Sequence, residues 1–157
     1  MRASRTAAEP HDENGLFERG NLVNQPETSQ AASILVVDDQ WINRELMETI
    51  LSGYGFSVLL AHSGEHALEM VAAHQPSLVL VDLRMPDMDG CEVTRHIKTN
   101  PQTRDTVVII VTALELNSED HRQIEEAAAD GLISRMTPAA ELVKIINQHL
   151  NRQHPGV

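Results

Sequence analysis

Three aspartates stand directly after apolar segments of this chain, where a folded protein would place them at the ends of strands. Asp38 and Asp39 follow the run ILVV at 34–37, and Asp82 follows the run LVLV at 78–81. If the two runs pair side by side, the carboxylates converge, and each like-charge pair about 4 Å apart costs about 4 kcal/mol at an effective dielectric constant near 20. A raised pKa, a protein cation or a hard divalent metal could offset this cost. We favour an oxygen site for Mg²⁺.

Two further residues follow apolar runs and could act at the same place. Thr112 comes after VVIIV at 107–111, and its hydroxyl could donate a hydrogen bond into a crevice beyond the strand ends. Arg135 comes after LIS at 132–134 and is a permanent cation that could pair with Asp82 or with an anionic group attached to it. The candidate site therefore combines carboxylates, a hydroxyl and a guanidinium.

A parallel sheet would bring these residues to one edge. The four runs already named, together with SVLLA at 57–61, alternate with segments of helical pattern. Runs that are apolar without alternation, as at 34–37, 78–81 and 107–111, are typical of strands covered on both faces, whereas the other two suit positions nearer an edge. The sequence therefore predicts an α/β fold with a doubly wound, five-stranded parallel sheet in a three-layer α/β/α arrangement.

The segments between the runs carry helix signals. Ser63 and Ser118 are predicted N-caps, since serine hydroxyls accept hydrogen bonds from the first turn of a helix. The segment after Ser118 is strongly polar, which predicts a solvated helix face. Its polar residues are Glu119, Asp120, Arg122, Gln123, Glu125 and Glu126.

Composition narrows the class of protein. The 157 residues include 12 Lys and Arg against 23 Asp and Glu, which gives a formal charge of −11. This charge repels nucleic acid and anionic lipid, and no basic patch offsets it, so we expect no nucleic-acid or membrane partner. A single cysteine forms no intramolecular disulfide, and neither a signal peptide nor an apolar run of about 20 residues is present, so we expect a cytoplasmic protein.

We divide the chain into three parts. Residues 1–32 are polar with few large apolar side chains, which predicts a disordered N-terminal extension. Residues 33–152 hold all the strand and helix signals and are expected to form one domain, and residues 153–157 form a short tail. Because so little follows residue 150, we expect a stand-alone domain without a DNA-binding output segment.

Several motifs together resemble the receiver domain of bacterial two-component response regulators. They are VVDD at 36–39, VDLRMPDMDG at 81–90, VTA at 111–113 and ADGLISRMTPAAEL at 129–142. The resemblance spans about 33–150 and implies a flavodoxin/CheY-like sheet of strand order 2-1-3-4-5.

The resemblance also implies roles for individual residues. Asp82 matches the phosphoacceptor, and Asp38 and Asp39 match the acidic pair that holds Mg²⁺ together with Asp82. Arg84 falls where a backbone carbonyl completes the metal site. Thr112 matches the hydroxyl that contacts the acyl phosphate, and Arg135 occupies a position usually held by lysine.

The function that this resemblance implies is that of a single-domain response regulator. It would take a phosphoryl group from a histidine of a sensor kinase or a phosphotransfer protein in a Mg²⁺-dependent reaction. It would then signal through contacts with a downstream protein, with a homodimer as an option. The chain would not be an enzyme beyond catalysing its own phosphorylation and dephosphorylation.

Three departures from the family pattern keep an alternative open. Besides Arg135, Met136 stands where the family usually has a proline in a cis peptide, so we expect a trans bond there, and Leu132 occupies the usual aromatic switch position. The alternative is a phosphorylation-independent adaptor whose switching has been lost. Two enzyme classes are less favoured: the acidic first loop disfavours a flavin carrier, and Arg84 stands where an aspartate-nucleophile phosphatase would have a second acid.

Overall fold

A central parallel sheet organises the protein, which we describe from a computed structural model covering residues 31–113 and 115–153. Its strands are β1 (Ser33–Val37), β2 (Ser57–Ala61), β3 (Leu78–Asp82), β4 (Val107–Thr112) and β5 (Gly131–Ser134). All pair in parallel in the order β2-β1-β3-β4-β5, which confirms the predicted topology. Residues 1–30 of the predicted disordered extension and residues 154–157 of the predicted tail lie outside the described residues.

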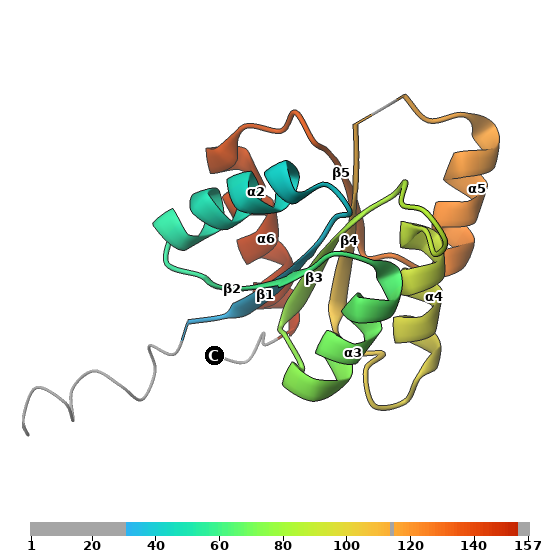
Figure 1. Cartoon of the computed structure of the whole chain (residues 1–157), viewed down its shortest axis with the longest axis horizontal. Helices are drawn as coiled ribbons and strands as arrows, with labels where there is room; N and C mark the ends of the chain where they lie inside the picture. The colour runs from blue at the N-terminus through green and yellow to red at the C-terminus, as the bar shows by residue number, and fades with distance from the viewer. Residues whose placement is uncertain (1–30, 114, 154–157) are drawn as a thin grey trace, which may run out of the picture. The chain divides into compact units, whose positions relative to one another are not determined.

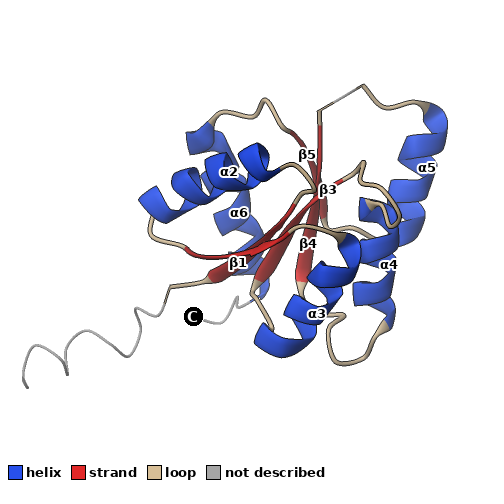
Figure 2. Ribbon diagram, in the orientation of Figure 1, coloured by secondary structure: helices blue, strands red, loops and turns tan. Residues whose placement is uncertain are grey.

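Helices cover both faces of this sheet. They are α2 (Trp41–Gly53), α3 (Gly64–His74), α4 (Gly90–Thr99), α5 (Ser118–Ala127) and α6 (Ala139–Gln153). Helices α2 and α6 lie on one face, and α3, α4 and α5 lie on the other (Figures 1 and 2). Within the described part of the chain, no helix combines the length and the apolar character needed to cross a bilayer.

The apolar strands explain why the sheet sits between two layers of helices. Strands β3 and β4 are buried along their whole length, and β1 is buried from Ile34 onward, whereas β2 and β5 are each fully buried at a single position, Ala61 and Ile133. Side chains that alternate along the central strands feed two separate hydrophobic clusters, one on each face. This confirms the predicted assignment of central and outer strands.

The helix starts agree with the sequence prediction at one cap and differ at the other. The Ser63 hydroxyl accepts a hydrogen bond from the His66 amide at 3.0 Å, as predicted for an N-cap. The N-cap of α5 is Asn117 and not Ser118. The reason is that the Asn117 side chain accepts from the Asp120 amide at 2.8 Å, while the Asp120 carboxylate accepts from the Asn117 amide at 3.1 Å.

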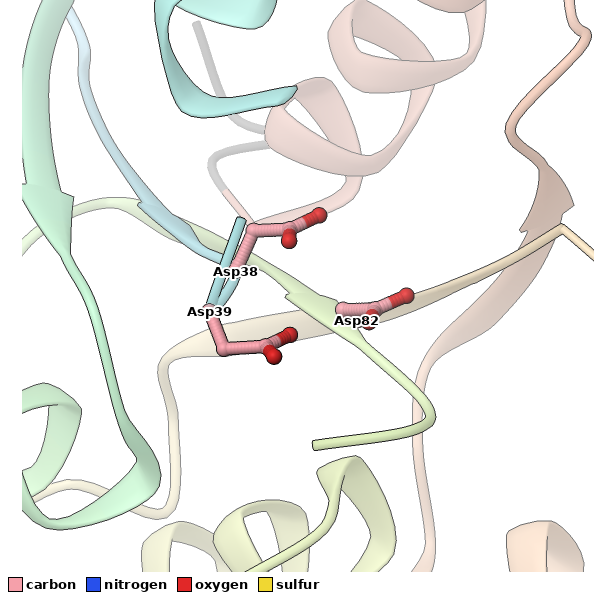
Figure 3. A group of neighbouring side chains, drawn as sticks. All are labelled: Asp38, Asp39 and Asp82. Carbon is pink, nitrogen blue, oxygen red and sulfur yellow. The ribbon is translucent and has the colours of Figure 1, made fainter. Parts of the chain in front are cut away.

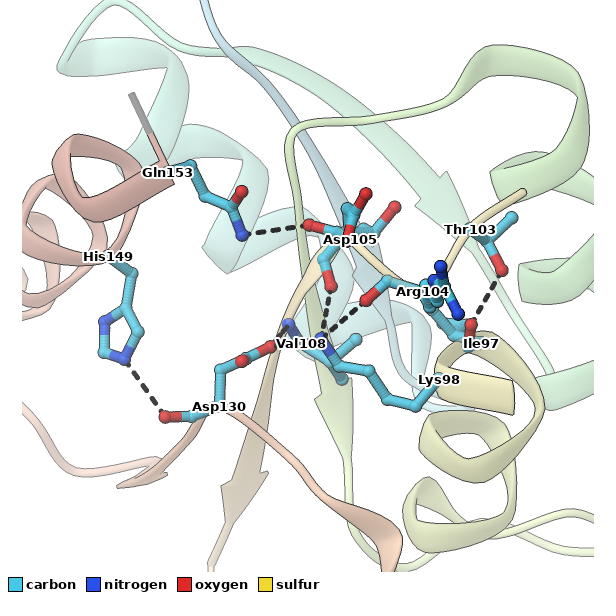
Figure 4. A network of polar contacts seen from close by, with 10 residues as sticks. Ile97, Lys98, Thr103, Arg104, Asp105, Val108, Asp130, His149 and Gln153 are labelled. Atoms are coloured by element: carbon cyan, nitrogen blue, oxygen red, sulfur yellow. Dashed lines mark hydrogen bonds and ion pairs between the residues drawn. The ribbon is translucent and has the colours of Figure 1, made fainter. Parts of the chain in front are cut away.

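A polar network fastens the loops at the amino ends of the strands (Figure 4). Lys98 on α4 forms an ion pair with Asp130 at 2.7 Å, and the same carboxylate accepts a hydrogen bond from the Val108 amide at 2.8 Å. Gln153, at the end of α6, donates to the Asp105 carbonyl at 2.9 Å. The network therefore joins two helices and the connections before β4 and β5, at the end of the sheet opposite the aspartates.

Candidate functional site

The three predicted aspartates meet at the carboxyl edge of the sheet (Figure 3). Strands β1 and β3 are paired neighbours with Val37 opposite Val81, so the residues that follow them emerge side by side. Asp38, Asp39 and Asp82 each offer a carboxylate oxygen, and these oxygens lie within 4.8 Å of one another. Asp38 and Asp82 are buried, and Asp39 is half-buried. Such a set of oxygens has the chemistry that Mg²⁺ prefers.

Arg135 bridges two of these carboxylates. Its Nη2 lies 2.6 Å from Oδ1 of Asp82, and its Nη1 lies 2.9 Å from Oδ2 of Asp38. The Arg135 amide also donates to the Thr112 carbonyl at 2.7 Å, which holds the arginine backbone against the end of β4. The sequence predicted the pairing with Asp82 but not the second pairing with Asp38. The guanidinium thus supplies part of the charge neutralisation that the acidic cluster demands.

The carboxylate oxygens of Asp38 and Asp39 differ in their hydrogen bonds. Oδ1 of Asp38 accepts hydrogen bonds from the Gln40 amide at 2.8 Å and from the Asn43 side chain at 3.3 Å. Both oxygens of Asp38 are therefore engaged with the protein. Among the described residues, no hydrogen bond or ion pair is recorded for the Asp39 carboxylate, which points toward Asp82 (Figure 3).

Asp82 has the most perturbed carboxyl group of the site. Its pKa is raised from 3.8 to about 6, first by burial and next by the negative charge of Asp38. The charge of Asp39 raises the pKa further, whereas the ion pair and hydrogen bond with Arg135 lower it. At neutral pH Asp82 is thus mostly ionised, but at a cost in free energy that a bound cation would reduce.

The backbone after β3 is held tightly around Asp82. The Leu83 amide donates to the Val111 carbonyl at 2.9 Å, and the Leu83 carbonyl accepts from the Gly90 amide at 3.0 Å. A Cβ on Gly90 would lie 2.5 Å from the Asp82 carbonyl oxygen. Only glycine permits this approach of α4 to the end of β3, which accounts for the glycine that ends the motif at 81–90.

Thr112 and Arg84 come from the carboxyl ends of β4 and β3, the strands that adjoin the cluster. Thr112 is buried at the end of β4, where it pairs in register with Ser134. Arg84 lies two residues beyond Asp82, and its side chain turns toward α5, where Nη2 lies 2.6 Å from Oδ1 of Asp120.

Asp120 is a functional candidate that the sequence analysis missed. We expected it on a solvated helix face, but the residue is only 7% exposed, so that prediction is wrong at this position. The cause is its place three residues after the N-cap Asn117, which turns its side chain back over the start of the helix. The spacing Asn-x-x-Asp is the signal that could have identified it.

Two of the three positions that depart from the family pattern lie at the surface. Met136 is 82% exposed and Leu132 is 38% exposed. The bond between Arg135 and Met136 is trans, as expected, because none of the peptide bonds between described residues is cis. The β5–α6 connection thus presents a large thioether to solvent one residue after Arg135.

Comparison with known proteins finds that this chain is similar to response regulators. The family model described as the response regulator receiver domain matches residues 34–147. The chain is 28% identical over 118 residues to the polar-differentiation response regulator DivK of Brucella ovis, a match that covers 75% of this chain and 95% of DivK.

Solved structures agree with this comparison. The signal receiver domain of a signal transduction histidine kinase from Syntrophus aciditrophicus is similar with a TM-score of 0.73 and 28% identity, over 78% of this chain and 92% of that one. The receiver domain of sensor histidine kinase PA1611 from Pseudomonas aeruginosa PAO1 has a TM-score of 0.72 and 26% identity, over 78% of this chain and 99% of that one. That domain was crystallised with a magnesium ion coordinated in its active site cleft.

Proposed function

The chain belongs to the response regulator receiver domain family, and from this premise we propose that it is a single-domain response regulator phosphorylated on Asp82. The donor is a histidine of a sensor kinase or a phosphotransfer protein, and the phosphorylated form signals by contacts with a downstream protein in the cytoplasm. The observation that carries this proposal is the convergence of Asp38, Asp39 and Asp82 at the carboxyl edge of the sheet, where Arg135 pairs with two of them.

The chemistry assigned to Asp82 is nucleophilic attack on phosphorus. An ionised Asp82 oxygen forms a bond to phosphorus while the bond between phosphorus and the donor imidazole nitrogen breaks, and the released imidazole takes up a proton from water. A pKa of about 6 leaves Asp82 mostly ionised at neutral pH, as this attack requires. The chain thereby acts on itself, with no separate substrate beyond the phosphodonor.

The other residues position charge around the transferred group. Mg²⁺, when held by the carboxylates of Asp38, Asp39 and Asp82 and by the Arg84 carbonyl, supplies the positive charge that phosphoryl transfer needs. Arg135 already reaches Oδ1 of Asp82, so it lies within reach of phosphoryl oxygens attached there. In this proposal the Thr112 hydroxyl donates a hydrogen bond to the same oxygens.

Exposed apolar side chains beside the cluster are assigned to docking of the phosphodonor protein. Ile42 and Leu46 lie one turn apart on α2, and Trp41 stands at its first position, and all are more than half exposed. A small pocket of about 60 Å³ lies between α2 and the β5–α6 connection, lined by Leu46 and Arg135 among others. Because contiguous exposed apolar surface marks interaction sites, a partner docked here would bring its histidine to Asp82.

A fluorescence titration of the full chain tests this proposal. Trp41 lies two residues after Asp39 and is 62% exposed, so it should report both Mg²⁺ and a beryllofluoride phosphate mimic. We expect a response to Mg²⁺ alone and a second response when the mimic is added, and Asp82→Asn should abolish the second. Incubation with a small acyl phosphate and Mg²⁺ should add the mass of one phosphoryl group to the wild type only.

The phosphorylation-independent adaptor is the outcome that would replace this proposal. It would show a metal response without any mimic response, and no added mass. Self-association is a separate question, which sedimentation of the protein with and without the phosphodonor answers directly.

A further inference from the structure

Asp120 is a buried carboxylate that the proposed reaction does not use. It lies in the first turn of α5, and its side chain is only 9% exposed. One oxygen accepts from the Asn117 amide at 3.1 Å, and the other lies 2.6 Å from Nη2 of Arg84, which is 36 residues away in sequence. The ion pair thus joins the loop after β3 to the start of the helix after β4.

The partner of this carboxylate is anchored beside the acidic cluster. Leu83 separates Arg84 from Asp82, and its amide and carbonyl are both hydrogen-bonded, to Val111 and to Gly90. The Arg84 backbone therefore stays near Asp82, whereas its side chain is 58% exposed and is free to change its direction. Water competes for so exposed a guanidinium, so Arg84 itself loses little when it leaves, whereas the buried Asp120 carboxylate depends on the pair.

A phosphoryl group on Asp82 would offer this guanidinium a stronger partner. Aspartyl phosphate carries more negative charge than a carboxylate and presents three acceptor oxygens, and arginine binds such groups with paired hydrogen bonds. Two other arginines reach this edge of the sheet: Arg135 is already shared between Asp38 and Asp82, and the Arg44 guanidinium donates to the Asp38 carbonyl at 2.6 Å. Arg84 differs from both because its backbone lies two residues after the phosphoacceptor and its present partner lies on α5.

We propose that Arg84 exchanges partners when Asp82 is phosphorylated, leaving Asp120 for the phosphoryl oxygens and so loosening the first turn of α5. This inference rests on the proposed function and extends it by naming the contact that carries the state of Asp82 to a helix. After the exchange, the buried Asp120 carboxylate keeps only the Asn117 amide as a partner among the contacts described above. An underpaired buried charge weakens the capping box that holds the first turn.

Hydrogen exchange of the α5 start measures this loosening. The relevant amides are those of Asn117, Asp120 and His121, each of which donates within the cap. The full chain is compared before and after treatment with a small acyl phosphate and Mg²⁺, with the extent of phosphorylation read from the intact mass. We expect these amides to exchange about threefold to tenfold faster in the phosphorylated wild type.

Three variants distinguish the proposed change of partner by Arg84 from a general loosening of the loop. Arg84→Gln keeps the backbone carbonyl but has no cation to transfer, so phosphorylation should leave its α5 amides unchanged. In Asp120→Asn the ion pair is already broken. Hydrogen exchange of the α5 amides should therefore be fast before phosphorylation, and phosphorylation should accelerate it no further. Arg122→Gln removes an exposed arginine from the same helix. Among the described residues Arg122 forms ion pairs with Glu119 and Glu126 alone, so this variant should behave as the wild type.

The outcomes are distinct. Equal acceleration in Arg84→Gln and in the wild type would overturn the exchange of partners, as would a phosphorylated wild type whose α5 amides do not change. No added mass on the wild type would refute the proposed function, and with it the proposed change of partner by Arg84. If Arg84→Gln takes up no phosphoryl group, Asp120→Asn decides the question. Hydrogen exchange of its α5 amides that stays the same after phosphorylation supports the change of partner, and faster hydrogen exchange refutes it.

Discussion

The raised pKa of Asp82 predicts that its negative charge destabilises the folded protein. The pKa moves from 3.8 to about 6, and this difference of about 2 pH units corresponds to about 3 kcal/mol at 1.36 kcal/mol per unit. Between pH 4 and 6 the folded state holds a proton that the unfolded state has lost, so the free energy of unfolding falls as the pH rises through this window. Above pH 7 the full cost is present.

Replacing Asp82 with asparagine removes the charge and keeps the shape. We expect Asp82→Asn to raise the free energy of unfolding by up to about 3 kcal/mol at pH 8 without divalent ions, and by almost nothing near pH 4. With a urea m-value of about 2 kcal/mol per molar, the unfolding midpoint at pH 8 should rise by roughly 1.5 M. Circular dichroism in the presence of EDTA measures the midpoint.

A matched control and a clear refutation accompany this prediction. Glu69→Gln removes an exposed carboxylate from α3 and should shift the midpoint by little at either pH. The reasoning fails if Asp82→Asn is less stable than the wild type at pH 8, or if the difference between the two proteins is the same at pH 4.5 and pH 8. Addition of Mg²⁺ should stabilise the wild type more than the variant, because the ion relieves the repulsion that the variant lacks.

Three further substitutions test other parts of the site. Arg135→Gln should bind Mg²⁺ about threefold to tenfold more tightly in the Trp41 titration, since the guanidinium no longer competes for the carboxylates; weaker binding would contradict this. Gly90→Ala should lower the free energy of unfolding by about 2–4 kcal/mol, because its Cβ would lie 2.5 Å from a backbone oxygen. Gly53→Ala, which has open space around it, should not be destabilised and serves as the control. Asn117→Ala should cost about 1 kcal/mol through loss of the N-cap of α5, measured by urea unfolding; an unchanged midpoint would show that the cap contributes nothing.

The fold could be predicted because its central strands are short and almost wholly apolar. Runs such as 78–81 and 107–111 admit few alternatives in a chain where helical patterns separate them, and the strands were found where they were expected. The N-cap of α5 was predicted one residue late. Two adjacent polar residues, Asn117 and Ser118, can both cap a helix, and the choice depends on which side chain the loop directs toward the first turn.

The candidate site was predicted where backbone position alone determines it. Asp38 and Asp82 end neighbouring strands, so topology brings them together. The second contact of Arg135 and the ion pair of Asp120 depend instead on how long side chains extend across the crevice. Local sequence spacing carries no information about partners that are 36 or 97 residues apart.

Helices α4 and α5 are attached to the end of β3 in different ways. The start of α4 rests directly on the main chain at the end of β3, through the close approach of Gly90 and its hydrogen bond to Leu83. The link from α5 to that loop is a side-chain ion pair. Helix α4 should therefore move with β3 as one block, whereas the first turn of α5 should be able to shift against that block once the ion pair opens. A chemical cross-link engineered between α4 and the first turn of α5 would let the acceptor react while keeping α5 from responding.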